Sequence, residues 1–113
     1  MPRVSKISKS PPAAVEDVLK RLGCNIRIAR LRRKLSREEL AERIGLSRYV
    51  LADIEKGKPT TAIAAYLGAL WALGLIRDMQ EVADPDHDQE GKILERARSP
   101  KTAPKRKTID DDF

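Results

Sequence analysis

The sequence predicts an all-α protein, a compact bundle of five or six helices with disordered tails. Apolar residues recur at intervals of three and four along the middle of the chain, which is the spacing of one helical face. Serines stand before two of these runs, where they can cap helices. Only 4% of the 113 residues are aromatic, so the core of the bundle must be aliphatic.

Charge and composition divide the chain into three parts. Residues 1–58 carry 15 Lys and Arg against 7 Asp and Glu, whereas residues 59–113 carry 8 against 10. We expect a disordered basic arm over 1–10, a helical domain over 11–83 and a flexible tail over 84–113. The positive half is the one suited to contact phosphate, because phosphate binding requires Lys and Arg.

The first part of the helical domain is predicted to hold two helices. Pro11 and Pro12 suit the start of a helix, which would end at Gly23. A second helix follows over 24–34, and its two apolar stripes indicate contacts with two neighbours. The stripes comprise Ile26, Ala29 and Arg30 on one side, and Cys24, Ile28, Leu31 and Leu35 on the other.

Two short helices joined by a tight turn are predicted over Leu35–Gly57. Ser36 is a good N-cap and Glu39 follows three residues later, which is the spacing of a capping box. Gly45 can adopt the left-handed conformation that ends the first helix. Ser47 can cap the second. Two helices separated by a turn of three or four residues through Gly match the helix-turn-helix pattern.

The second of these helices has two chemically different faces, at about 100° per residue. The inward face comprises Val50, Leu51, Ile54 and Glu55. The outward face comprises Arg48, Tyr49, Ala52, Asp53 and Lys56. A helix with mixed polar chemistry on its outer face fits the major groove of DNA, with its N-terminal residues at the base edges.

Two further helices are predicted before the tail. Thr60 or Thr61 can cap the first, and Gly74 can end it. Its core-facing side chains are expected to be Ile63, Leu67, Leu70 and Trp71. We interpret Trp71 as core or dimer-interface packing rather than a platform for stacking bases, because it lies in an apolar helix. The last helix, over 75–83, is expected to bury Ile76, Met79 and Val82 or Ala83.

The run SREELAERIGLSRYVLADIEKG, residues 36–57, resembles the Xre family of helix-turn-helix regulators, which includes the Cro and cI-type phage repressors. The matching positions are Ser36, Leu40, Ala41, Gly45, Leu46, Ser47, Leu51, Ile54, Glu55, Gly57 and Pro59. The resemblance covers roughly residues 26–75. It implies a lambda-repressor-like fold and a homodimer that binds a double-stranded, palindromic operator in the bacterial cytoplasm, at the nucleoid. Where the family usually has Gln or another polar residue, this chain has Arg37 and Tyr49.

The resemblance also implies a structural ion pair. In the family, a Glu at the position of Glu55 pairs with an Arg of the first core helix, and Arg30 matches that Arg. Glu55 falls on the inward face of its helix, where an unpaired charge would be costly. We therefore expect Arg30 and Glu55 to stabilise the fold and not to take part in catalysis.

The candidate DNA-binding residues fall into two groups. Those for base edges are Arg48, Tyr49 and Asp53, with Ala52 allowing close approach. An Arg can donate twice to guanine, an acid can accept from cytosine, and a ring can touch the methyl group of thymine. Those for phosphates, at helix N-termini or beside the groove, are Ser36, Arg37, Ser47, Lys56 and Lys58. The alternative for each charged residue is a solvated surface side chain.

A narrower resemblance covers residues 60–100. The segments AYLGALWALGL and VADPDHDQEGK resemble the C-terminal part of HipB-type antitoxins, the Xre-family partners of HipA-type kinase toxins. This resemblance implies an autorepressing antitoxin that binds both DNA and a toxin. The acidic stretch 84–90 is a poor metal site, because it has one His and lacks the Gly and final Glu of a calcium loop. No metal or cofactor is expected.

An enzyme is not expected. The chain has no glycine-rich phosphate loop and no CxxC, HExxH or GxSxG motif, and its one His and one Cys lie far apart. We see no signal peptide, and the single cysteine suits a reducing cytosol. The sequence therefore predicts a DNA-binding repressor and antitoxin. The alternatives are a stand-alone or phage-type repressor and an adaptor that kept the fold without binding DNA.

Overall fold

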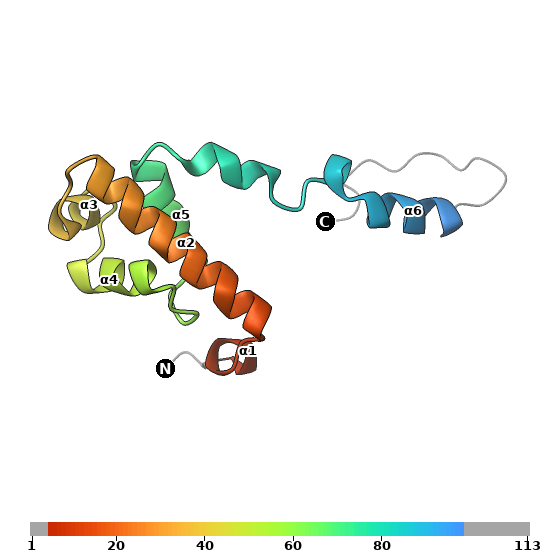
Figure 1. Cartoon of the computed structure of the whole chain (residues 1–113), viewed down its shortest axis with the longest axis horizontal. Coiled ribbons are helices and arrows are strands. Elements are labelled where there is room, and N and C mark those ends of the chain that lie inside the picture. Colours follow the sequence, from red (N-terminus) through yellow and green to blue (C-terminus); the bar gives the residue numbers. More distant parts are fainter. Residues whose placement is uncertain (1–4, 99–113) are drawn as a thin grey trace. The chain divides into compact units, whose positions relative to one another are not determined.

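The computed structural model describes residues 5–98, and within them it contains six α-helices, two 3-10 helices and no strand. The expected all-α fold class is thereby confirmed for the part that is described. The chain divides into two compact units between Met79 and Gln80, and each is described by itself. Helices α1 to α5 belong to the first unit (Figure 1). The tails expected to be disordered fall partly on 1–4 and 99–113, outside the described residues.

A short helix lies within the stretch expected to be a disordered arm. Helix α1, Lys6–Lys9, is capped by Ser5, whose Oγ accepts a hydrogen bond from the Ser8 amide at 3.3 Å. None of its residues is buried. Apolar periodicity is absent here, and the turn forms through a local side-chain cap that such periodicity does not reveal.

The helix break predicted at Gly23 is wrong. Helix α2 runs without interruption over Ala13–Arg32. A Cβ at Gly23 would stand 2.5 Å from the Ile54 carbonyl oxygen and 2.7 Å from the Glu55 carbonyl oxygen. Glycine is therefore required because the backbone of another helix crosses α2 at contact distance, and not because α2 ends there.

The two stripes of α2 have different outcomes. The stripe of Ile26, Ala29 and Arg30 is buried, with Ile26 fully enclosed and Ala29 and Arg30 nearly so. The second stripe was expected to contact a neighbour, and this is wrong for most of it: Ile28 and Leu31 are exposed. Gly23 lies in line with the first stripe. The backbone of the helix that contains Ile54 and Glu55 approaches α2 closely at Gly23, and this approach determines which side of α2 faces the core.

Helix α3, Arg37–Arg43, begins with the predicted capping box. Ser36 Oγ accepts a hydrogen bond from the Glu39 amide at 3.0 Å, and Glu39 Oε1 accepts one from the Ser36 amide at 3.1 Å. Gly45, with φ of 69°, adopts the left-handed conformation expected after the helix. The chain is thereby turned toward the next helix at the predicted place.

Helix α4, Arg48–Lys56, is also bounded as predicted. Ser47 Oγ accepts a hydrogen bond from the Val50 amide at 3.2 Å, and Gly57 ends the helix with φ of 73°. Its buried residues are Leu51, Ile54 and Glu55. The largest fully buried side chains of the first unit come from α2, α3 and α4 and are Ile26, Leu40, Leu51 and Ile54. The predicted inward face of α4 therefore lies in the core.

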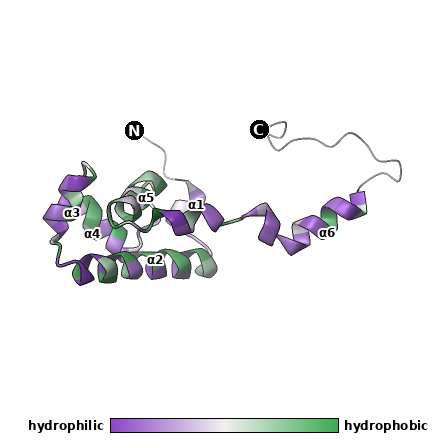
Figure 2. Ribbon diagram, turned by 90° about the horizontal axis from the view of Figure 1, so that it is seen from above, coloured by the Kyte–Doolittle hydropathy of each residue, from purple (hydrophilic) through white to green (hydrophobic). Residues whose placement is uncertain are grey.

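Helix α5, Ile63–Ala72, packs through a face different from the predicted one. Ile63 and Trp71 are 69% and 63% exposed, so their placement in the core was wrong. The helix is apolar on most sides (Figure 2), so periodicity did not determine its orientation. The buried residues around it are Tyr66, Ala69, Leu70 and Leu73. The Tyr66 hydroxyl donates to the Lys58 carbonyl oxygen at 2.7 Å, which ties this face to the preceding loop.

The start of α5 also differs from the prediction. Its N-cap is Ala62 and makes no side-chain hydrogen bond, so the expected cap at Thr60 or Thr61 was wrong. The Thr61 amide donates to the Lys58 carbonyl oxygen at 3.4 Å, so the loop turns once more before the helix begins. The helix ends as predicted before Gly74, which has φ of 78°.

The segment after Gly74 forms 3-10 helix η1, Ile76–Glu81, in place of the predicted last α-helix. Ile76 and Met79 pack partly against the core as expected. Val82 and Ala83 are both exposed, so the prediction that one of them is buried was wrong; both follow the last turn of η1.

The second unit contains 3-10 helix η2, Pro85–His87, and helix α6, Gln89–Arg98. The Asp84 and Asp88 carboxylates accept hydrogen bonds from backbone amides at the starts of these helices. Neither helix has a buried residue. No three His, Cys, Asp or Glu side chains in residues 5–98 are grouped so that they could hold a metal ion. Over the same residues, no helix is long and apolar enough to cross a membrane.

Candidate nucleic-acid interface

A buried ion pair joins α2 to α4. Arg30 Nε lies 2.6 Å from Glu55 Oε2, and Arg30 Nη2 lies 3.1 Å from Glu55 Oε1. The two side chains are only 7% and 2% exposed. Arg30 Nη1 also donates to the Leu35 carbonyl oxygen at 2.8 Å. This bidentate contact fixes the position of α4 against α2, because the two charges neutralise each other only when Arg30 and Glu55 face one another.

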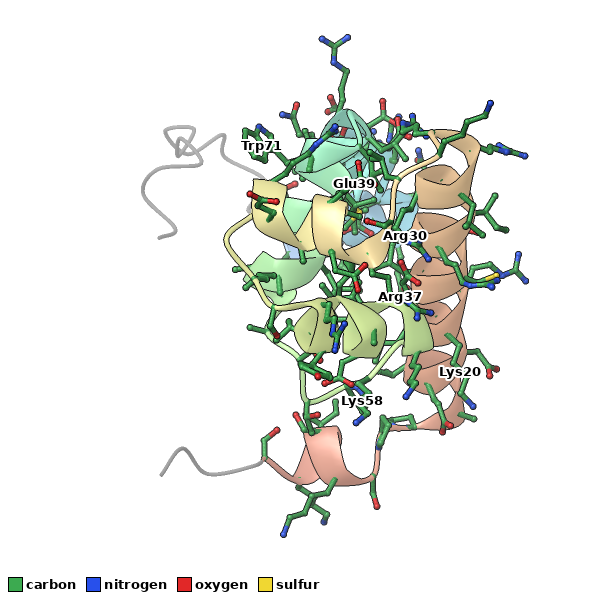
Figure 3. All side chains as sticks on the ribbon, turned by 90° about the vertical axis from the view of Figure 1, so that its left-hand side faces the viewer. Lys20, Arg30, Arg37, Glu39, Lys58 and Trp71 are labelled. Carbon is green, nitrogen blue, oxygen red and sulfur yellow. The ribbon has the colours of Figure 1, made fainter. Side chains whose placement is uncertain are left out.

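Arg37, at the start of α3, joins the same carboxylate. Its Nε lies 3.1 Å from Glu55 Oε1, while its side chain remains 45% exposed. Burial by itself raises the pKa of the Glu55 carboxyl, but the hydrogen bonds from Arg30 and Arg37 outweigh it, so this pKa lies below its ordinary value. Figure 3 shows Arg30 and Arg37 reaching toward the same region from different helices. A residue predicted to bind phosphate is thus oriented by the core.

Arg48 and Tyr49 form an exposed cluster at the first turn of α4. Arg48 Nη1 lies 3.2 Å from Glu38 Oε1, and Arg48 Nη2 donates to the Tyr49 hydroxyl at 3.0 Å. The Arg48 guanidinium carbon lies 5.0 Å from the centre of the Tyr49 ring. The pKa of Glu38 is lowered, first by a hydrogen bond to its own backbone amide and then by Arg48. Two of the three side chains predicted at base edges are therefore exposed and in contact with each other.

These residues surround an open depression of about 540 Å³ between α2, α3 and α4. We call it the arginine depression, and it is lined by Arg27, Arg30, Ser36, Arg37, Glu38, Arg48, Tyr49 and Ala52. The structure thus brings five of the predicted DNA-binding residues to one concave surface: Ser36, Arg37, Arg48, Tyr49 and Ala52.

The remaining predicted site residues lie elsewhere on and around α4. Asp53 Oδ1 is 3.3 Å from Lys58 Nζ, so the base-edge candidate and the phosphate candidate are paired with each other. Lys56 is exposed in the last turn of the helix. Ser47 serves as the N-cap. These four residues do not line the arginine depression.

Two residues of the depression were not among the predicted site residues. Arg27 lies on α2, outside the helix-turn-helix pair. Glu38 reaches Arg48 across the turn between the two helices. The repeat of apolar residues places each helix face, but it carries no signal for polar contacts between helices. The one signal in the sequence for the contact between Glu38 and Arg48 was the presence of an acid in the first turn of α3.

A comparison with protein families matches residues 26–67 to the family HTH_3, described as helix-turn-helix. The match begins in the middle of α2 and ends in α5. It reaches only the start of the run 60–100, on which the HipB-type resemblance depends. The comparisons with curated proteins and with solved structures gave no match. Residues 26–67, which contain α3 and α4, are therefore similar to helix-turn-helix domains of the HTH_3 family.

Proposed function

We propose that this protein is a sequence-specific DNA-binding transcriptional repressor that places α4 in the major groove of a double-stranded operator. The observation that carries the proposal is the first turn of α4. Arg48 and Tyr49 are exposed there, while Glu55 anchors the opposite face of the same helix in the core. The N-terminal residues of a recognition helix are the ones that reach base edges. The helix-turn-helix family match supports the same assignment.

The contacts suggest a division of roles around α4. Arg48 donates to guanine and the Tyr49 ring touches a thymine methyl group. Asp53 reads cytosine once its pair with Lys58 opens. Ala52 allows close approach, and the phosphate contacts come from Ser36, Arg37, Ser47, Lys56 and Lys58. Arg37 keeps its terminal amino groups for phosphate, because only its Nε is used by Glu55.

A pair of substitutions tests this division. Arg48→Ala removes a bidentate base contact and is expected to cost about 1–3 kcal/mol on the operator, with relaxed preference at one base pair. Lys56→Ala is expected to weaken all duplexes similarly and to make the dependence of affinity on salt shallower. Duplex titrations over a range of salt concentrations measure both effects. Equal losses on operator and random DNA for Arg48→Ala would contradict its role in reading bases.

We further propose that the protein acts as a homodimer on a palindromic operator. Half-sites separated by one turn of DNA require two recognition helices related by a twofold axis. Ile63 and Trp71 on α5 supply an exposed apolar surface in the first unit, and Trp71 projects outward in Figure 3. A second copy of the chain would cover these side chains.

The finer proposal is that the protein is the autoregulating antitoxin of a HipA-type kinase toxin. It rests on the resemblance of residues 60–100 to HipB-type antitoxins. Helix α6 supports it, because Ile93 and Leu94 are exposed and the helix has no buried residue. A segment of this kind gains apolar contacts only on a partner.

Truncation after Ala83 tests this part. The shortened chain is expected to keep most of its operator affinity and to lose much of its affinity for the toxin kinase encoded beside it. Calorimetry with the neighbouring gene product and duplex titration can use the same preparation. Unchanged toxin binding would show that the tail does not contribute to the toxin interface and acts only as a linker. A protein with no toxin partner would be a stand-alone or phage-type repressor, and one that binds no duplex at low salt would be an adaptor.

A further inference from the structure

The arginine depression combines guanidinium groups from three helices. Arg27 comes from α2, Arg37 from α3 and Arg48 from α4, and all three side chains line one concave surface. Residues far apart in the sequence therefore converge there because of the fold, and only α3 and α4 belong to the helix-turn-helix pair. A planar guanidinium with several N–H donors is the side chain best suited to bind the oxygens of a phosphate group.

The charge of this surface is positive after its internal pairs are counted. Four arginines line the depression, and the carboxylates that contact them are Glu38 and Glu55. Two positive charges therefore remain. Tyr49 and Ala52 complete the wall of the depression and carry no charge that would offset this excess.

The free donors lie on Arg27 and Arg37. Arg37 uses Nε for Glu55 and keeps both terminal amino groups. Arg27 is exposed, and among residues 5–98 its side chain has no hydrogen bond or ion pair. Arg48, in contrast, already contacts Glu38 and the Tyr49 hydroxyl. Arginines with unpaired donors therefore line the depression from α2 and α3.

We infer that the arginine depression binds one phosphate group and that Arg27 of α2 is one of its donors. This inference rests on the proposed function, in which the group bound is a backbone phosphate of duplex DNA. The helix that precedes the helix-turn-helix pair thus becomes part of the DNA surface. Arg27 fixes the position of the duplex and does not read its sequence, because phosphate contacts carry no sequence information directly.

The first experiment measures duplex affinity against salt concentration for the full chain and two variants. Arg27→Gln removes the proposed donor. Arg32→Gln is the matched control, because Arg32 is an exposed arginine of the same helix and lies outside the depression. Arg27→Gln is expected to weaken operator and random duplexes by the same factor and to reduce the slope of log affinity against log salt by about 1. Arg32→Gln is expected to leave the slope unchanged. Equal slopes for the two variants would overturn the inference.

The second experiment uses inorganic phosphate and separates this inference from the proposed function. The NMR signal of the Arg37 Nε–H group is followed while sodium phosphate replaces sodium chloride at constant ionic strength. A saturable shift in the wild type that is weakened in Arg27→Gln supports the site, even if the protein binds no duplex. In that case DNA binding fails as the function and a free anion is the ligand. No saturable shift, together with no slope change in Arg27→Gln, excludes the phosphate site.

Discussion

Replacement of Glu55 is expected to cause a large loss of stability in the helix-turn-helix domain. Glu55→Ala removes the acceptor of three hydrogen bonds from two arginines. Arg30 would remain buried with the Leu35 carbonyl oxygen as its one acceptor. Breaking a buried pair from one side costs about 3–5 kcal/mol, because the remaining charge is uncompensated. Arg37 adds little to this cost, since it is partly exposed and can turn toward solvent.

That loss is large compared with the whole stability of the first unit. Folded domains have about 0.05–0.15 kcal/mol per residue, and the described part of this unit, residues 5–79, is short. Each kcal/mol shifts Tm by roughly 4–8 °C in a domain of this size, so Glu55→Ala should lower Tm by at least about 12 °C. Thermal and urea unfolding followed by circular dichroism measure the effect.

Two further variants and the pH dependence make the test specific. Glu42→Ala removes an exposed acid from α3 and should change Tm little. The double change Arg30→Met with Glu55→Leu should cost less than Glu55→Ala, since no unpaired charge remains. The folded pKa of Glu55 lies below its ordinary value of 4.5, so the pair stabilises the fold above that pH, and this contribution is lost as pH falls through the lower folded pKa. A Glu55→Ala protein that melts with the wild type would refute the burial of this pair.

Two other substitutions follow from the packing. Gly23→Ala should destabilise by about 1–3 kcal/mol, because its Cβ would meet the Ile54 carbonyl oxygen at 2.5 Å. Gly68→Ala is its control and should be neutral or stabilising by up to ~1 kcal/mol, since the nearest atoms belong to the Ile44 side chain at 3.9 Å. Equal effects in urea unfolding would contradict the close crossing of the helices. Trp71→Ser should leave Tm nearly unchanged and weaken dimerisation in sedimentation experiments, whereas a large fall in Tm would place Trp71 in the core.

The helix-turn-helix segment was predictable because local chemistry determines it. Ser36 with Glu39 and Ser47 before α4 satisfy backbone amides at helix starts, and Gly45 and Gly57 permit left-handed backbone at the ends. These signals act within a few residues and do not depend on the rest of the fold. The boundaries of both helices therefore followed from the sequence.

The errors arose where distant contacts decide the structure. Gly23 has the same local character as a helix-ending glycine, but its role is set by the backbone of α4 at Ile54 and Glu55. The apolar composition of α5 allows several orientations, and a hydrogen bond from Tyr66 to Lys58 is part of what selects one. Polar contacts between helices, such as Glu38 with Arg48, have no counterpart in periodicity. Six of the eight residues that line the arginine depression were therefore singled out from the sequence, whereas Arg27 and Glu38 were not.

Selection of bound duplexes from a random pool tests the central claim most directly. The full-length protein and its Arg48→Ala variant are each used to enrich duplexes, which are then sequenced, and the enriched site is footprinted upstream of the protein's own gene. We expect one enriched palindromic motif for the wild type, protection of that motif at the gene, and relaxed preference at one position of each half-site for Arg48→Ala. Enrichment of no motif by the wild type, or identical motifs for the two proteins, would contradict sequence reading by α4.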